Sequence, residues 1–457
     1  MKANPENPDL NRRDFLRGSS FASLMLMLGA VELRAEEKPK TDDANAKSKG
    51  AKVKCGVIGC GKWGREILNK LASLPAAEVA GVCETYEPFL RRAQEAAPKA
   101  EAFTDYRKLL EKKEIIAVAV ATPSHQHKEI VLAALQAGKH VFCEAPLATT
   151  IDDARAIARA AQAAPSQLFQ TSLPMRSDPQ RHFLLQFIRS GALGKSLKSR
   201  SQWHKKTSWR FTSANPDREK EINWRLSAAN SLGLIGEIGI HQVDAAAWFL
   251  RARPVAVTGY GSILQWPDGR DVADTIHAVF EFPGGVNFTY DCTLGNSFDA
   301  DYDMIYGSDA AVLLRENKAW MFKEVDAPLL GWEIYARKDT FYRETGIALV
   351  ANATKLVAQG DKSAEEAPYA STALGYALEA FVANTDMINT AVEDFKENFN
   401  ASDKKAMQNY IAGLSKNLLP AAGYKEGYEA AVTVIKASEA IQKNQKITFL
   451  PEWFEIG

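Results

Sequence analysis

The feature that most constrains the fold is a glycine-rich turn between a short apolar run and an amphipathic run. The turn has the spacing G-x-G-x-x-G, formed by Gly59, Gly61 and Gly64. In such a turn the first glycine permits a tight bend, the second admits a pyrophosphate beside the backbone, and the third lets a helix pack on the strand. With a strand expected over 53–58 and a helix over 65–74, the turn predicts an α/β dinucleotide-binding domain.

An acidic residue at the expected distance supports this hypothesis. The next apolar run, 78–83, ends in Glu84, which follows Gly64 by 20 residues. A carboxylate there can accept both hydroxyls of the adenosine ribose and would repel a 2′-phosphate, so NAD is expected in preference to NADP. The alternative is a plain glycine turn that binds no nucleotide.

Apolar and amphipathic runs continue to alternate up to residue 172. The almost purely apolar run 115–121 and the run 140–143 predict strands of a parallel sheet that is covered on both faces. Ligands bind at the carboxyl ends of such strands, so the side chains that follow them are expected in the nucleotide crevice. The residues expected to bind the cofactor are Gly59, Gly61, Lys62, Trp63, Gly64, Glu84, Thr122, Pro123, His127, Glu144 and Pro146.

The N-terminus has the pattern of an export signal. Residues 11–17 read Asn-Arg-Arg-Asp-Phe-Leu-Arg and precede an apolar run, 21–31, that is too short to span a bilayer. Paired arginines followed by Phe-Leu and a basic residue are typical of a twin-arginine signal. We expect a signal peptide over 1–35 and a linker over 36–51. The alternative is a basic tail with a chance apolar patch.

Export and nucleotide binding together constrain the mechanism. The twin-arginine export machinery carries folded proteins, and little free NAD is present outside the inner membrane. A periplasmic or otherwise exported enzyme is therefore expected to keep its cofactor bound and to regenerate it within each turnover. No stable membrane insertion is expected after cleavage.

Composition excludes several classes of function. Lys plus Arg (56) equals Asp plus Glu (56), so no charge excess indicates nucleic acid as a partner. The five cysteines form no C-x-x-C pair, and no metal site is expected. The length remaining after the linker is sufficient for two domains, expected over 52–172 and 173–457.

Several segments, in order, resemble the Gfo/Idh/MocA oxidoreductase superfamily. They are GVIGCGKWG (56–64), ATPSHQHKEIVLAALQAGKHVFCEAPLA (121–148), SGALGK (190–195), NWRL (223–226) and GEIGIHQVD (236–244). The resemblance implies an α/β Rossmann domain followed by an α+β domain with a large open antiparallel sheet. It also implies tightly held NAD(P), action on sugars or inositols, and association into a homo-oligomer.

The main departure of this sequence from the family pattern lies after the fifth strand. The family usually has Glu-Lys-Pro after the fifth strand, and its lysine reaches the substrate hydroxyl and the nicotinamide ribose. This chain has Glu-Ala-Pro over 144–146, and the methyl group of Ala145 can neither polarise a hydroxyl nor relay a proton. Either Lys205 or Lys206 replaces the lysine in space, or the protein has become catalytically idle.

The second catalytic segment is closer to the family pattern. Glu237, His241 and Asp244 have the spacing i, i+4, i+7, which predicts one helical face. Family members usually carry Asp-x-x-x-His, so the resemblance implies that His241 is the catalytic base and Glu237 its orienting partner or a proton relay. An imidazole with a pKa near neutrality suits that role.

Aromatic and cationic residues around these segments suit a saccharide, because aromatic faces stack on sugar C–H surfaces while cationic donors bond hydroxyls. Arg176 also falls where the family often has a substrate-contacting arginine. The residues expected to bind substrate are Arg176, Trp203, Lys205, Trp224, Arg225 and Asp244.

The sequence thus predicts an exported NAD-dependent oxidoreductase that acts on a sugar or sugar derivative. One alternative is an NAD-assisted glycosidase, which would oxidise a ring hydroxyl transiently, eliminate the aglycone and return the hydride. Another is a non-catalytic sugar-binding protein. Residues 327–420 carry no readable motif and are expected to cover the cleft or extend a subunit interface.

Overall fold

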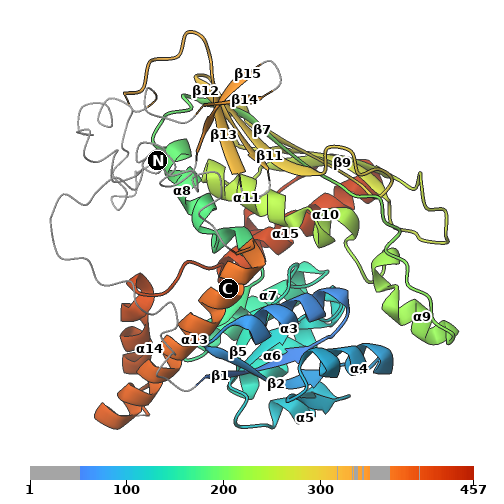
Figure 1. The fold of residues 1–457 in the computed structure, drawn as a ribbon, viewed down its shortest axis with the longest axis vertical. Helices are drawn as coiled ribbons and strands as arrows, with labels where there is room; N and C mark the ends of the chain where they lie inside the picture. Colours follow the sequence, from blue (N-terminus) through green and yellow to red (C-terminus); the bar gives the residue numbers. More distant parts are fainter. Residues whose placement is uncertain are drawn as a thin grey trace.

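The chain folds around two β-sheets (Figure 1). The computed structural model describes residues 52–315, 318–331, 333, 338–341, 344–349, 371–400 and 402–457. The expected signal peptide and linker lie outside the described residues. Within these ranges no helix is both long and apolar enough to cross a bilayer.

The first sheet is parallel and has the strand order β3-β2-β1-β4-β5-β6. Its strands are β1 (Val53–Ile58), β2 (Ala77–Cys83), β3 (Glu101–Phe103), β4 (Ala117–Val120), β5 (His140–Cys143) and β6 (Phe169–Thr171). This order belongs to the Rossmann fold, and it reverses direction between β1 and β4, where a crevice opens for ligands. The expected parallel α/β domain is confirmed.

Helices cover the parallel sheet because the central strands are apolar on both faces. All four residues of β4 are buried, as expected for a strand between two helical layers. The helices of this domain are α3 (Lys62–Ser73), α4 (Glu87–Ala96), α5 (Tyr106–Leu110), α6 (His127–Gln136) and α7 (Ile151–Ala163).

The second sheet has ten strands in the order β14-β15-β13-β12-β11-β7-β10-β9-β8-β16. They are β7 (Ser196–His204), β8 (Ala256–Ser262), β9 (Thr275–Glu281), β10 (Asn287–Thr293), β11 (Asp301–Gly307), β12 (Ala310–Arg315), β13 (Lys318–Lys323), β14 (Lys338–Phe341), β15 (Glu344–Ala348) and β16 (Ile447–Thr448). The pairings are antiparallel except for β7 with β10, which is parallel. The predicted large antiparallel sheet is confirmed, with this one parallel pair inside it.

The antiparallel sheet buries one face and exposes the other. Along β9, Ile276, Ala278 and Phe280 are buried while His277 and Val279 are exposed, which is the alternation of a half-covered strand. The buried face packs on helices of the second domain, among them α11 (Ile240–Leu250).

Two long helices from the C-terminal part return to the Rossmann domain. Helix α13 (Ala373–Asn398) packs beside the parallel sheet, where Phe381 contacts Phe142 with ring centroids 5.6 Å apart. Helix α15 (Tyr424–Lys443) lies between the two sheets (Figure 1). Within the described part of 327–420, β14 and β15 extend the second sheet while α13 packs on the Rossmann core. The expected cleft cover or subunit interface stays a prediction. The domain boundary at residue 172 stays a prediction. Helices α13 and α15 follow it in the sequence and pack against the domain that precedes it.

Candidate active site

The glycine turn after β1 fits a dinucleotide. Gly59 has φ +90°, and a Cβ at Gly64 would lie 1.9 Å from the Gly59 carbonyl oxygen, so only glycine allows α3 to approach the turn. A Cβ at Gly61 would meet no atom within 4 Å, which leaves open space for a pyrophosphate. Lys62 and Trp63 form the exposed first turn of α3, whose N-terminus has no side-chain cap, so its N–H groups are free for phosphate oxygens.

Glu84 is held at the end of β2 by two backbone donors. Its Oε2 accepts the Cys60 N–H at 2.9 Å and its Oε1 accepts the Tyr86 N–H at 2.9 Å. Thr85 Oγ1 also lies 3.4 Å from Oε1, whereas Oε2 keeps a lone pair that can accept a ribose hydroxyl. The position and orientation that the NAD hypothesis requires are therefore present.

His127 joins the loops that follow β4 and β5. Its Nδ1 lies 3.0 Å from the Pro146 carbonyl oxygen and its Nε2 lies 2.9 Å from that of Thr122. Burial lowers the pKa of His127 to about 4. With both nitrogens placed on backbone carbonyls, His127 orients these loops and offers no free nitrogen to the cofactor that it was expected to bind.

The same loops carry buried polar atoms without partners. Within the described part of the chain, Thr122 Oγ1 and Glu144 Oε1 have no hydrogen-bond partner. Burial raises the pKa of Glu144 to about 7, and the nearby Ser172 and Trp63 side chains, followed by the charge of Arg225, oppose the rise. Because an unsatisfied buried polar atom is costly, such atoms at strand ends indicate where donors of a ligand fit. Pro123 and Pro146 lie in these loops.

The second catalytic segment is not one continuous helix, so the prediction of a single helical face is wrong. Helix α10 (Gly233–Glu237) ends before Ile238, whose φ of −122° and ψ of −54° interrupt it, and α11 begins at Ile240. A Cβ at Gly239 would lie 2.8 Å from the Tyr290 ring, so the break is packed tightly against β10.

Glu237 makes its contacts away from His241. Its carboxylate accepts hydrogen bonds from Ser124 at 3.3 Å and Ser231 at 3.2 Å, and Oε2 lies 3.6 Å from the Nε of Arg225. The bond to Ser124 joins the loop after β4 to the second domain. Ser124 was missed by the sequence reasoning, since a serine in a loop carries no motif.

His241 lies in the first turn of α11 and presents an unused nitrogen. Its Nδ1 is buried and has no partner among the described residues. Burial lowers the pKa of His241 to about 4, in contrast to the near-neutral pKa that was expected. The imidazole is therefore uncharged at neutral pH and able to accept a proton.

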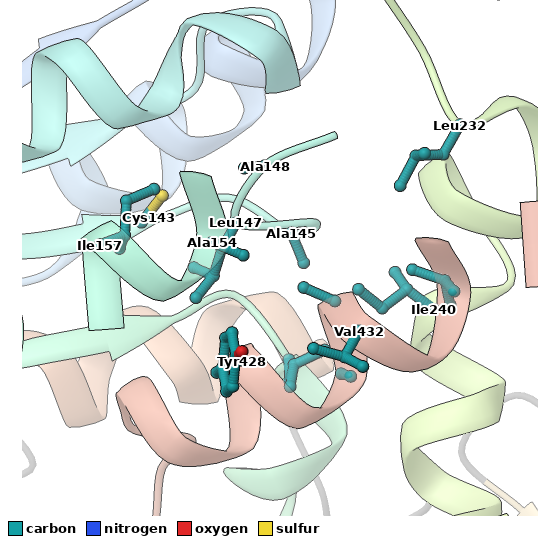
Figure 2. Close-up of a cluster of buried hydrophobic side chains, with 14 of the residues drawn as sticks. Cys143, Ala145, Leu147, Ala148, Ala154, Ile157, Leu232, Ile240, Tyr428 and Val432 are labelled. Carbon is teal, nitrogen blue, oxygen red and sulfur yellow. The ribbon is translucent and has the colours of Figure 1, made fainter. Parts of the chain in front are cut away.

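The loop with Ala145 and the start of α11 meet in one apolar cluster. Figure 2 shows Ala145 in this cluster with Ile240 and Val432. Ala145 is 8% exposed. Glu144 precedes Ala145 and His241 follows Ile240, so each of the two expected catalytic segments contributes a residue to this cluster between the domains.

Arg225 is the cation that the structure places at this boundary. Its guanidinium lies 4.4 Å from the centroid of the Trp224 ring, beside Glu237. Trp224 is buried and contacts the ring of His125, whose Nδ1 lies 3.2 Å from the Asn230 carbonyl oxygen. The segment that carries Trp224 and Arg225 thus docks on the loop after β4.

The remaining expected substrate residues are engaged elsewhere. Arg176 and Asp244 pair with each other through two hydrogen bonds of 2.9 and 2.8 Å, which engage both oxygens of the Asp244 carboxylate. Trp203 is half-buried in β7. Lys205 and Lys206 are exposed beyond β7, and the structure describes no contact of either side chain with the Rossmann domain. The hypothesis that one of them replaces the family lysine gains no support.

Within the described ranges, no three His, Cys, Asp or Glu side chains are arranged to hold a metal ion.

Comparison with known proteins identifies relatives that match about half of this chain. Inositol 2-dehydrogenase 2 of Saccharopolyspora erythraea is 30% identical over 232 residues, which are 50% of this chain and 63% of that protein. An α-N-acetylgalactosaminidase of Shewanella oneidensis is 24% identical over 234 residues, which are 48% of this chain and 50% of that protein. The chain thus spans half to two-thirds of the length of these curated relatives.

The fold and the family models agree with these matches. The crystal structure of an oxidoreductase domain protein from Kribbella flavida superposes with a TM-score of 0.64 at 20% identity, covering 88% of this chain and 100% of that one. The model of an oxidoreductase family with an NAD-binding Rossmann fold matches residues 53–171, and that of the GFO/IDH/MocA C-terminal domain matches 183–312. These two models cover more than half of the chain, which therefore belongs to the Gfo/Idh/MocA oxidoreductase family.

Proposed function

We propose that this protein is an NAD-dependent oxidoreductase that acts on a sugar or sugar derivative. The observation that carries the proposal is that Glu144 Oε1 and His241 Nδ1 are both buried without a partner, in segments whose neighbouring residues Ala145 and Ile240 belong to one apolar cluster. The Arg225–Glu237 pair lies at the same boundary. A site of this kind offers an acceptor for a hydroxyl proton and charged partners for the remaining hydroxyls.

The residues divide the chemistry between them. When bound, NAD supplies the hydride acceptor, and the glycine turn and Glu84 would hold its pyrophosphate and adenosine ribose. His241, uncharged at neutral pH, accepts the proton of the reacting hydroxyl at Nδ1. Arg225 favours negative charge that develops on the substrate oxygen, which is the contribution that Ala145 cannot make. The Trp224 face supports the guanidinium through a cation–π contact.

The proposal includes the cell compartment and the state of the cofactor. The twin-arginine pattern over 1–35 supports export to the periplasm, and the scarcity of free NAD there supports a cofactor that stays bound and is recycled. The exposed face of the second sheet displays Tyr260 and Val279, which supports association into a homo-oligomer.

A second candidate is an NAD-assisted glycosidase. The match to an α-N-acetylgalactosaminidase favours it, because that relative carries a glycosidase name and is 24% identical over 234 residues. Such a cycle returns its hydride and has no net redox change, so it needs no second substrate to reset the cofactor. Like the oxidoreductase, the glycosidase would need an NAD that stays bound.

The decisive experiment starts from the mature protein purified without added nucleotide. Denaturation followed by mass spectrometry identifies and counts any dinucleotide per chain, and near-stoichiometric NAD is expected. Sugars and glycosides are then screened for a change in reduced-nicotinamide absorbance and for aglycone release without an added oxidant. Aglycone release alone would select the glycosidase, while a protein free of NAD that also fails to bind it would refute both catalytic functions.

A further inference from the structure

A segment of the second domain crosses to the Rossmann domain directly beside Glu84. We call residues 205–223 the arm; it includes α9 (Pro216–Ile222), which lies near α4 in Figure 1. Arg218 Nη2 donates to the Thr85 carbonyl oxygen at 2.8 Å, and its Nη1 lies 3.4 Å from Thr85 Oγ1. The same guanidinium lies 5.9 Å from the centroid of the Tyr86 ring. The arm therefore contacts the two residues that follow Glu84.

A second contact comes from an aromatic side chain at the base of the arm. The rings of Phe211 and Phe89 meet edge to face with centroids 6.2 Å apart. Phe89 also lies 5.3 Å beneath the guanidinium of Arg65, whose Nη1 donates to the Cys60 carbonyl oxygen at 2.9 Å. Through Phe89 the arm thus connects to the glycine turn as well as to the end of β2.

The arm is stiffened by its own hydrogen bonds. The Asn223 side chain accepts from the Phe211 N–H and donates to the Phe211 carbonyl oxygen, both at 2.8 Å. Arg210 bonds Asp268 at 3.0 Å and Glu219 at 3.3 Å, and Asp268 in turn pairs with the buried Arg270 at 2.7 Å. These bonds hold Phe211 and α9 in place without help from the Rossmann domain.

The contacts are placed where a Rossmann domain receives adenosine. The acidic residue after the second strand binds the adenosine ribose, so Thr85 and Tyr86 border that half of a bound dinucleotide. The two domains already share a core through α15, and docking of the domains does not require the arm. Phe211 remains 36% exposed at the rim, which leaves part of its ring free to contact a base.

We propose that the arm binds the adenosine half of the cofactor and retains it, so that NAD leaves only when Arg218 and Phe211 separate from the Rossmann domain. The inference rests on the proposed function, because it needs a dinucleotide in the crevice. It assigns to the second domain a cofactor-binding role besides its substrate-facing one. It also gives a physical basis for a cofactor that stays bound through turnover.

The test measures cofactor dissociation directly. Arg218→Ala and Phe211→Ala are compared with Lys220→Ala, which removes an exposed charge from the same helix α9. Each protein is loaded with NADH and chased with excess NAD in a stopped-flow fluorimeter. We expect dissociation to become faster by about tenfold or more in Arg218→Ala, since a charge-assisted hydrogen bond is lost, and to stay unchanged in Lys220→Ala.

The outcomes separate this inference from the proposed function. Wild-type protein that binds NADH, with Arg218→Ala and Phe211→Ala releasing it at the wild-type rate, would refute the arm while leaving the oxidoreductase intact. Wild-type protein that binds no NADH would remove the proposed function and the inference together. Melting temperatures measured without nucleotide show whether each variant is folded, and Arg218→Lys, which keeps the charge, should release NADH at an intermediate rate.

Discussion

Replacing Arg225 tests whether its charge keeps Glu237 ionised. Its Nε lies 3.6 Å from Glu237 Oε2, and the side chains are 39% and 3% exposed. At an effective dielectric constant of about 20, the attraction of two unit charges at that distance is about 4 to 5 kcal/mol. The exposure of Arg225 to water reduces this to roughly 2 kcal/mol. Losing that attraction would raise the pKa of Glu237 further.

The sign of the pH dependence follows from burial. Burial raises the pKa of Glu237 in the folded protein, and the charge of Arg225 opposes the rise. A carboxyl group whose folded-state pKa exceeds its unfolded-state pKa lowers stability as pH rises between the two values. Arg225→Met removes the opposing charge, so it raises the folded-state pKa of Glu237 and widens the pH range over which stability falls. The substitution should therefore change the free energy of unfolding little at pH 4.5 and reduce it by roughly 2 kcal/mol at pH 8.

Urea unfolding at the two pH values measures the effect in four proteins: wild type, Arg225→Met, Glu237→Gln and the double variant. The coupling energy of the pair should be roughly 2 kcal/mol at pH 8 and near zero at pH 4.5. Arg253→Met is a matched control, because it breaks an exposed pair with Glu429 and should cost less than about 1 kcal/mol at either pH. An equal loss for Arg225→Met at both pH values would refute the electrostatic argument and leave stacking on Trp224 as the contribution of Arg225.

Three further predictions concern the base, the glycine turn and the shared core. His241→Ala should abolish turnover without changing NAD content. Because burial lowers the pKa of His241 to about 4, the acidic limb of the wild-type kcat/KM profile should lie near pH 4. A limb near pH 6.5 would contradict this burial. Gly64→Ala should prevent folding of the turn, because its Cβ would lie 1.9 Å from a carbonyl oxygen. Gly61→Ala has open space around its Cβ and should keep the wild-type melting temperature. It should bind NADH at least about tenfold more weakly in a fluorescence titration. Phe381→Ala should lower the free energy of unfolding by about 3 to 5 kcal/mol in urea, and a loss below about 1 kcal/mol would show that α13 is not part of the Rossmann core.

The Rossmann domain was predictable because its signals are local. The strands expected over 53–58 and 140–143 are both observed with the same bounds. In both cases an apolar run and a turn or capping residue lie within a few positions of each other, so neighbouring residues determine the element. The parallel pairing of β7 with β10 joins segments that are about ninety residues apart, and no pattern within either strand specifies it.

The candidate site was harder to predict because its geometry depends on distant contacts. The spacing of Glu237 and His241 is compatible with one helix, but the chain breaks between them, where Gly239 packs closely against Tyr290. The ion pair between Arg176 and Asp244 joins residues that are 68 positions apart. Each was assigned to the substrate because sequence spacing cannot show that the two charges satisfy each other.

The way the domains are joined bears on how a cofactor could leave. A cleft between hinged domains opens when the domains separate. Here α13 and α15 bury side chains against the Rossmann domain, and among them Phe381 and Tyr428 are fully buried. Separation would expose these side chains to water, and burying an aromatic side chain of this size is worth about 1.5 to 3 kcal/mol. Opening along this boundary is therefore the costly route, whereas displacement of the arm breaks a few polar and edge-to-face contacts at the adenosine side. If the cofactor is retained, its dissociation rate should follow the contacts of Arg218 and Phe211 more closely than the stability of the core.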